Sequence, residues 1–260
     1  MRRFFLDPER FDGRSAIIGG DDARHIRNVL RMQPGQGLEL IDGTGTLLWG
    51  RIEALAGPDV VVAIEGTKKA VAAPVRLTLA LGYLKDEKMD LVLRQATELG
   101  IARWQPFFAE RSVARPGAAR LAGRLARWEK IAREAVKQCR RDVCPRIDGP
   151  VGYAQMLDLA SDAKVKLLFW EKTPGPFCID GHAGHYPLDV WFIVGPEGGL
   201  TDQEVDAAAS RGFRTAGLGP RILRAETAAL AACTLVQHRF GDLGCPVESE
   251  KNLDNVPSCQ

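Results

Sequence analysis

The sequence has few of the residues that build metal and disulfide sites. Its 260 residues include four histidines and six cysteines, with no C-x-x-C arrangement and no cysteine at metal-ligand spacing from a histidine. Neither a zinc site nor a disulfide framework is supported. No apolar run approaches the roughly 18 residues of a membrane-spanning helix, and there is no internal repeat or low-complexity tract.

The start of the chain is not expected to act as a targeting signal. The opening MRRFFLDPER has three apolar residues between two arginines and Asp7-Pro8, far fewer than the apolar core of a secretory signal needs. Because 45% of the residues are apolar, the chain can bury a substantial core. We therefore expect a soluble, cytoplasmic protein that has neither a membrane nor a metal as a partner.

The net positive charge of the chain is small, but the excess of basic residues is concentrated in the middle of the chain. The formal net charge is +2, yet residues 73–150 hold sixteen basic and nine acidic residues, while residues 151–260 hold nine and fourteen. Such a local excess is typical of a polyanion-binding surface, and a solvated helix face is the alternative. Six basic residues on one predicted helix, here named the basic stripe, recur at three- and four-residue multiples: Arg120, Arg124, Arg127, Lys130, Lys137 and Arg141.

Residues 1–72 have the pattern of a small β-barrel. Short β-like runs (RRFFL, SAIIG, GLELIDG, TLLWGRIEAL and VVVAIEG) are separated by turn residues, with one helical stretch at Asp21–Arg31. The Asp42-Gly43 pair predicts a hairpin turn, because Asp and Gly tolerate the backbone angles that such turns need. The unpatterned stretch Lys68–Pro74 is the expected boundary between two domains.

After Pro74 the pattern changes to strands alternating with helices, which predicts an α/β domain with a largely parallel sheet. A Thr201/Glu204 capping box marks one helix start, and residues 241–260 are expected to form a flexible tail. The expected strands are Arg76–Tyr83, Arg103–Phe108, Val165–Trp170, Val190–Val194 and Phe213–Leu218. The expected helices are Lys88–Leu99, Arg120–Arg141, Thr201–Ser210 and Glu226–His238.

Two glycine-containing loops follow two of these strands: GPEGG at Gly195–Gly199 and LGPRILRAETA at Leu218–Ala228. The first has neither the Lys-Ser/Thr of a P-loop nor the G-x-G-x-x-G spacing of dinucleotide sites. Ligands of open α/β sheets bind beyond the carboxyl ends of strands, so both loops are predicted to hold a ligand. Their aliphatic neighbours suit a flat heteroaromatic ring such as adenine, and ordinary strand-to-helix turns are the alternative.

Four blocks carry a family resemblance: RQATELGIARWQPFFAERSV, REAVKQCRRDVCPRI, FIVGPEGGLTDQE and LGPRILRAETAAL. Together with RRFFL and HIRNVLR they resemble the ribosomal RNA small subunit methyltransferase E family of the SPOUT superfamily, over about residues 2–240. Gln95 stands where the family's KATELG block has a lysine.

The resemblance implies a PUA-like RNA-binding β-barrel over residues 1–72 and a SPOUT α/β methyltransferase domain with a trefoil knot over residues 73–240, acting as a homodimer. It implies methylation of N3 of a uridine in 16S rRNA of the small ribosomal subunit, with S-adenosyl-L-methionine as cofactor. The cofactor residues implied are Leu168, Val194, Gly195, Pro196, Gly198, Gly199, Leu218, Gly219, Ile222, Leu223 and Arg224.

The implied chemistry needs a cation and a base, because uridine N3 becomes nucleophilic only as its proton leaves and charge spreads to O2 and O4. Arg224 is the candidate cation, with Arg221 as a second one nearby, and Glu226 is the candidate to orient Arg224 or to take the proton. A structural salt bridge between Arg224 and Glu226 is the alternative. RNA is expected to contact Arg2, Arg3, His25, Arg31, Arg111, Arg124, Arg127, Lys137 and Arg140.

Two rival functions remain open at this stage. One is a SPOUT enzyme that methylates another position, such as a ribose 2′-hydroxyl of RNA. The other is a non-catalytic RNA-binding factor in ribosome assembly, although a pure binder has no reason to carry both glycine loops.

Overall fold

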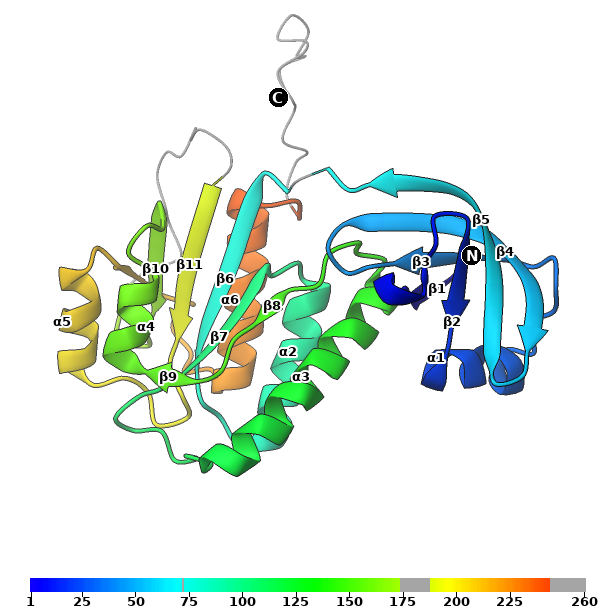
Figure 1. Cartoon of the computed structure of the whole chain (residues 1–260). Coiled ribbons are helices and arrows are strands. Elements are labelled where there is room, and N and C mark those ends of the chain that lie inside the picture. Colours follow the sequence, from blue (N-terminus) through cyan, green and yellow to red (C-terminus); the bar gives the residue numbers. More distant parts are fainter. Residues whose placement is uncertain (72, 174–187, 244–260) are drawn as a thin grey trace, which may run out of the picture.

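The structure is a computed structural model that describes residues 1–71, 73–173 and 188–243. Its strands form two sheets, one of five strands and one of seven, on either side of residue 72. In Figure 1 the five-stranded sheet lies to one side of the seven-stranded sheet and its helices. The C-terminal end of helix α3 (Ala118–Cys139) lies against strand β1 (Arg2–Phe5), so the two halves of the chain are in contact.

The N-terminal sheet is built from the short runs that the sequence predicts as strands. Its order is β1-β3-β4-β5-β2, with β1 and β3 parallel and the other neighbours antiparallel. Within the described residues no pairing of β1 with β2 closes this sheet, so it is an open sheet where a barrel is expected. Besides β1, its strands are β2 (Ser15–Ile18), β3 (Gly37–Ile41), β4 (Thr46–Ala56) and β5 (Asp59–Lys69).

Helical turns between β2 and β3 cover the core of this sheet. The short helix α1 (Gly20–Arg24) continues into a π-helical turn, η2 (His25–Val29), and buries Ala23 and Ile26. The backbone N–H of Leu30 donates to the carbonyl five residues earlier, and the chain leaves through Arg31 at a φ of 50°. The helical stretch expected over Asp21–Arg31 is therefore confirmed up to Val29, and its second half is a wider π-helical turn.

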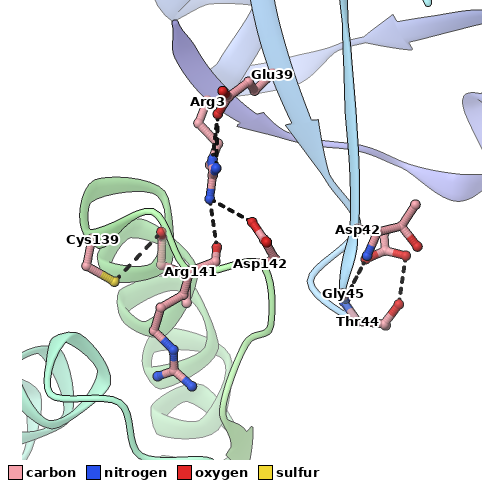
Figure 2. A network of polar contacts seen from close by, with 10 residues as sticks. Arg3, Glu39, Asp42, Thr44, Gly45, Cys139, Arg141 and Asp142 are labelled. Carbon is pink, nitrogen blue, oxygen red and sulfur yellow. Dashed lines mark hydrogen bonds and ion pairs between the residues drawn. The ribbon is translucent and has the colours of Figure 1, made fainter. Parts of the chain in front are cut away.

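Asp42 holds the turn between β3 and β4, as the Asp-Gly pair predicts. Its Oδ1 accepts backbone N–H bonds from Thr44, Gly45 and Thr46 at 2.7, 3.0 and 2.9 Å, and the Thr44 hydroxyl donates to Oδ2 at 2.7 Å (Figure 2). Burial opposes ionisation, but these hydrogen bonds outweigh it and lower the pKa of Asp42 to about 2. The hairpin turn is confirmed.

The C-terminal sheet is parallel throughout its described pairings. Its order is β12-β10-β11-β6-β7-β8, and β9 pairs with β7. Central strand β11 pairs with β6 and β10, so the middle of the sheet joins segments that are far apart in the chain. The strands are β6 (Val75–Gly82), β7 (Arg103–Phe108), β8 (Arg146–Ile147), β9 (Val151–Gly152), β10 (Val165–Phe169), β11 (Leu188–Val194) and β12 (Arg214–Ala216).

The two faces of this sheet pack into separate cores. Leu167 and Phe169 of β10 pack with residues of α2, α3 and α6, whereas Leu168 between them packs with residues of α4 and α5. Both faces are covered, which explains why these strands are apolar in succession and show no alternation. Besides α3, the helices are α2 (Asp86–Glu98), α4 (Tyr153–Leu159), α5 (Asp202–Ser210) and α6 (Ala225–Phe240).

All five expected strands of the C-terminal half are confirmed within two residues at each end, as are helices α2, α3 and α5. Helix α6 runs to Phe240, two residues beyond its expected end. Strands β8 and β9 and helix α4 are not among the expected elements. Strands of two residues are too short for any periodicity to reveal, and α4 has only seven residues. The expected linker is shorter than predicted, since β5 continues to Lys69. Of the expected tail, residues 244–260 lie outside the described residues.

Arg3 ties the two halves of the chain together. From β1 its guanidinium reaches Glu39 of β3 and, across the junction, Asp142 and the carbonyl of Arg141, all at 3.0 Å (Figure 2). Its side chain is only 9% exposed. The Arg141 side chain in turn donates to the carbonyl of Thr97 in α2 at 2.8 Å. The contact surface between the two halves therefore contains a partly buried polar network.

Candidate active site

A cavity of about 440 Å³ opens where β6, β10, β11 and β12 end. Neighbouring parallel strands bring their carboxyl ends to one edge of the sheet, which is where open α/β sheets bind ligands. The volume lies in the range of roughly 300–1,000 Å³ that small-molecule sites occupy. The lining residues are Lys88, Phe169–Glu171, Val194–Gly199, Leu218, Gly219, Arg221–Ala225 and Ala228.

The first wall of the cavity is the loop Gly195–Gly199 between β11 and α5. The N–H of Gly199 donates to the carbonyl of Pro196 at 2.9 Å, and Gly199 has a φ of 71° that favours glycine. Helix α5 follows at once, with the Thr201/Glu204 capping box confirmed. Gly82 at the end of β6 packs closely against this loop, since a Cβ there would stand 2.3 Å from the backbone nitrogen of Pro196.

The second wall is the loop between β12 and α6. Strand β12 is held to β10 by the N–H of Trp170, which donates to the carbonyl of Ala216 at 3.0 Å. Helix α6 starts directly after Arg224, whose side chain makes no capping hydrogen bond. Ile222 in this loop is 86% exposed, an unusual state for a large apolar side chain at the rim of a cavity.

The fold brings together ten of the eleven residues expected to hold a cofactor, all but Leu168, along the lining of this cavity. Leu168 is fully buried in the core on the opposite face of the sheet, and Phe169 lines the cavity in its place. The role of Leu168 stays a prediction that the cavity lining does not support, because successive side chains of a strand point to opposite faces.

Arg224 and Glu226 do not form the structural salt bridge that the sequence leaves open. Glu226 is paired with Lys88 at 3.1 Å, and within the described residues the Arg224 guanidinium has no hydrogen-bond or ion-pair partner. Burial acts to raise the pKa of Glu226, but its own backbone N–H and Lys88 outweigh that effect and lower the pKa. The site thus holds an ionised carboxylate beside an unpaired cation.

Sequence reasoning missed part of this lining. Lys88, Phe169, Trp170, Glu171 and Glu197 face the cavity without having been expected there. A signal existed for Lys88, since it follows the end of β6 and the ends of parallel neighbours converge. Gln95, the departure from the family pattern, lies elsewhere on α2, with a buried Oε1 that has no hydrogen-bond partner among the described residues.

The residues of the basic stripe, on α3 and just beyond its end, are paired within the protein. Apart from Glu134 on α3 itself, its partners lie on α1 and α2, where a charge count along one helix does not reveal them. Arg120 and Arg124 contact Asp86, Arg124 and Arg127 contact Asp90, Lys130 contacts Asp21, Lys137 contacts Asp22 and Glu134, and Arg141 contacts the Thr97 carbonyl. The stripe is therefore a weaker indication of RNA binding than its spacing suggests.

The other residues expected to contact RNA fall into two groups. Arg3 is committed to the junction network and is almost inaccessible. Arg2 and Arg140 lie together at a cleft between β1 and the end of α3, and His25 lines the same cleft. These three side chains have no hydrogen-bond or ion-pair partner in the described part of the chain. Arg31 and Arg111 are also exposed, and the backbone of Arg111 lies beside Gly198 of the first loop.

Neither a metal cluster nor a membrane-spanning helix occurs among the described residues. Cys139, Cys144 and Cys233 are free thiols, and the other three cysteines lie outside the described ranges.

Family models match both halves of the chain. An RNA methyltransferase domain matches residues 71–237, and an RNA methyltransferase PUA domain matches residues 18–65. These two matches define the class as RNA methyltransferases that carry a PUA domain.

The chain belongs to the ribosomal RNA small subunit methyltransferase E family. The member from Mycobacterium bovis is 32% identical over 236 residues, which cover 88% of each chain, and the member from Bacillus subtilis is 29% identical over 92% of this chain and 97% of its own. The crystal structure of the member from Neisseria gonorrhoeae, bound to S-adenosyl methionine, matches with a TM-score of 0.80 and 33% identity over 92% of this chain and 98% of that one.

Proposed function

We propose that this protein transfers a methyl group from S-adenosyl-L-methionine to N3 of a specific uridine in 16S rRNA of the small ribosomal subunit. The observation that carries the proposal is the cavity at the strand ends, in which two glycine-containing loops stand beside an unpaired arginine. Family membership and the S-adenosyl methionine bound to the Neisseria relative support the same reaction class.

The residues of the cavity fit this cofactor. Glycines at 195, 198 and 199 expose backbone polar groups that side chains would otherwise cover, and a Cβ on Gly198 would stand 2.7 Å from the Arg111 carbonyl. Val194, Leu218 and Leu223 supply apolar walls for a heteroaromatic ring. We assign cofactor binding to Val194, Gly195, Pro196, Gly198, Gly199, Leu218, Gly219, Ile222, Leu223 and Arg224.

The cofactor supplies an activated methyl group on a sulfonium. The protein's task is to orient the uracil and to make its N3 nucleophilic. Arg224, free of internal partners, is placed to stabilise the negative charge that appears on O2 and O4 as the N3 proton leaves. Glu226, held ionised by Lys88, orients this end of the site, and its lowered pKa makes it a weaker proton acceptor than an ordinary carboxylate.

We assign RNA recognition to residues 1–72, the half of the chain that carries the PUA domain, and catalysis to residues 73–240, as a SPOUT domain whose C-terminal segment forms a trefoil knot. The exposed Ile222 at the cavity rim favours a homodimer in which a second copy covers this side chain. Light scattering that finds an active monomer would contradict the dimer. Because its substrate is ribosomal, we place the protein in the cytoplasm.

Nucleoside analysis of rRNA from a strain that lacks the gene tests the function. The expected result is the loss of N3-methyluridine from 16S rRNA, with return of the modification when the gene is restored. Loss of a 2′-O-methyl nucleoside would favour the rival position on the ribose. If no nucleoside changes and the purified protein does not bind S-adenosylmethionine in calorimetry, the protein is a non-catalytic assembly factor.

A further inference from the structure

Lys88 joins three segments that meet at the cavity. It lies in the first turn of α2, and its Nζ stands 3.3 Å from Glu197 Oε1 and 3.1 Å from Glu226 Oε2. Glu197 belongs to the first glycine loop, and Glu226 lies in the first turn of α6, after the second loop. One ammonium group therefore connects α2 with both walls of the cavity.

The surroundings of this contact make it stronger than an ordinary surface ion pair. The side chains of Lys88, Glu197 and Glu226 are 31%, 24% and 16% exposed, so water screens them only in part. The backbone N–H of Lys85 also donates to Glu197 Oε1 at 3.3 Å, which anchors the carboxylate from a second direction. The ion pairs with Glu226 and Glu197 raise the pKa of Lys88, so its ammonium stays charged throughout the neutral range.

The two cations nearest to Glu226 have different roles. Arg224 carries no internal partner in the described structure and is available to a ligand, whereas Lys88 is engaged by two carboxylates. An ammonium with both contacts made inside the protein has little capacity left for substrate. Its position instead determines where the two carboxylates stand.

We propose that Lys88 is a positioning residue of the methyl-transfer site: its ammonium holds the Glu226 carboxylate and the loop Gly195–Gly199 in a fixed relation. This inference rests on the proposed function only where it predicts the rate of methyl transfer. The contact itself is a property of the free protein.

Loss of Lys88 should change the ionisation of Glu226. Burial raises the pKa of this carboxyl, and the bonds to its own backbone and to Lys88 hold it down. Without the ammonium, the burial effect gains weight and the pKa of Glu226 rises. The other charged groups that face the cavity are Glu171 after β10, Glu197 after β11, and Arg221 and Arg224 before α6.

Carbon-13 NMR titration of the glutamate carboxyl groups tests the contact in the full chain without RNA or cofactor, with the Glu226 signal assigned from Glu226→Gln. In Lys88→Met we expect the Glu226 midpoint to move to higher pH, and in Lys88→Arg to return toward the wild-type value. Lys85→Met is the matched control. It removes an exposed charge at the start of the same helix and keeps the backbone N–H that donates a hydrogen bond to Glu197. An unchanged midpoint in Lys88→Met would overturn the inference.

Kinetics test the consequence for methyl transfer, with purified small ribosomal subunits as the RNA probe. Lys88→Met should lower kcat about 10- to 100-fold, the range seen when a group that orients a functional side chain is removed, with a smaller change in KM for the RNA. The increase of its rate with pH should also occur at a higher pH than in the wild type. In a Glu226→Gln background the same substitution should cost little more, because Lys88 acts through Glu226.

The outcomes separate this inference from the proposed function. If wild-type protein methylates no RNA while the titration behaves as expected, the proposed function fails and the positioning contact stands. If wild-type protein is active and Lys88→Met keeps its kcat and pH profile, the positioning role is wrong. Should Lys88→Met not fold, Glu197→Gln gives the same readouts, and wild-type kinetics in that variant would also contradict the role.

Discussion

Arg3 Nη1 and Asp142 Oδ1 lie 3.0 Å apart, so the first strand of the chain is bonded to the residue three positions beyond the end of α3. The same guanidinium also bonds Glu39 and the Arg141 carbonyl. Three groups from both halves of the protein thus share one cation, and its removal leaves them without this partner (Figure 2).

We predict that Arg3→Ala destabilises the junction between the two halves by about 1.5–3 kcal/mol, the cost of losing hydrogen bonds to a charged group. Chemical denaturation measures the loss, and hydrogen exchange should locate it at residues 141–144. Arg2→Ala is the matched control, since Arg2 is its exposed neighbour. Equal stability of the two variants would show that the network contributes nothing.

Gly219 offers a test of the cofactor site. It lines the cavity at a φ of 91°, and an added Cβ would meet no protein atom within 4 Å. Gly219→Ala should therefore reduce the affinity for S-adenosylmethionine in calorimetry, at a stability cost of about 1 kcal/mol from the left-handed backbone. Gly212→Ala carries the same backbone strain, at a φ of 85° beyond α5, and should leave the affinity unchanged.

Arg224→Ala should lower kcat by about two to three orders of magnitude, the usual effect of removing one preorganised donor to a developing anion. Its melting temperature should barely change, because the guanidinium makes no hydrogen bond or ion pair within the described structure. Arg224→Lys should rescue poorly, since an ammonium lacks the planar fork. A variant that melts early and keeps its kcat would identify Arg224 as a brace of the loop instead.

Asp42 gives a prediction for acid stability. Its pKa is lowered from an ordinary 3.8 to about 2, so its stabilising effect is present above about pH 4 and is lost as the pH falls through 2. A shift of this size corresponds to about 2 kcal/mol. Asp42→Asn should be less stable than wild type at pH 7 by up to that amount. Denaturation curves at pH 2 should bring the two proteins close together.

The cleft residues and the basic stripe should differ in RNA binding. Neutralising Arg2 or Arg140 with glutamine should each lower the slope of log K against log salt by about 1, because one fewer phosphate counterion is released. Arg124→Gln should chiefly reduce stability, since it breaks pairs with Asp86 and Asp90. If Arg124→Gln lowers the slope of log K against log salt and leaves the stability unchanged, the basic stripe is the RNA-binding surface.

The sequence predicts the order of the main elements well because their signals are local. Apolar runs mark β6, β7, β10 and β11, and Thr201 with Glu204 marks the start of α5. Local signals cannot give the partner of a charged side chain, since Asp86 and Asp90 of α2 reach across to another helix. For this reason the loops of the candidate site could be predicted, whereas the Lys88–Glu226 pair and the neutralised stripe could not.

The phase of β10 shows a second limit. A strand buried on both faces has no alternation, so the sequence does not say that Leu168 turns away from the cavity while Phe169 turns toward it. The pairing of β10 with β11 and β12 decides this phase. Such pairing is a property of distant segments, and only the three-dimensional structure supplies it.

The position of β11 between β6 and β10 has a consequence for synthesis of the chain. Strand β6 can pair with β7 soon after both are synthesised. Its other edge has no partner until β11, which lies 113 residues later, has been synthesised. At translation speeds of about 5–20 residues per second this delay lasts roughly 6 to 20 seconds. During that time an apolar strand edge stands open on the nascent chain, and Val75–Gly82 is where capture by a chaperone, or aggregation in its absence, is expected to begin.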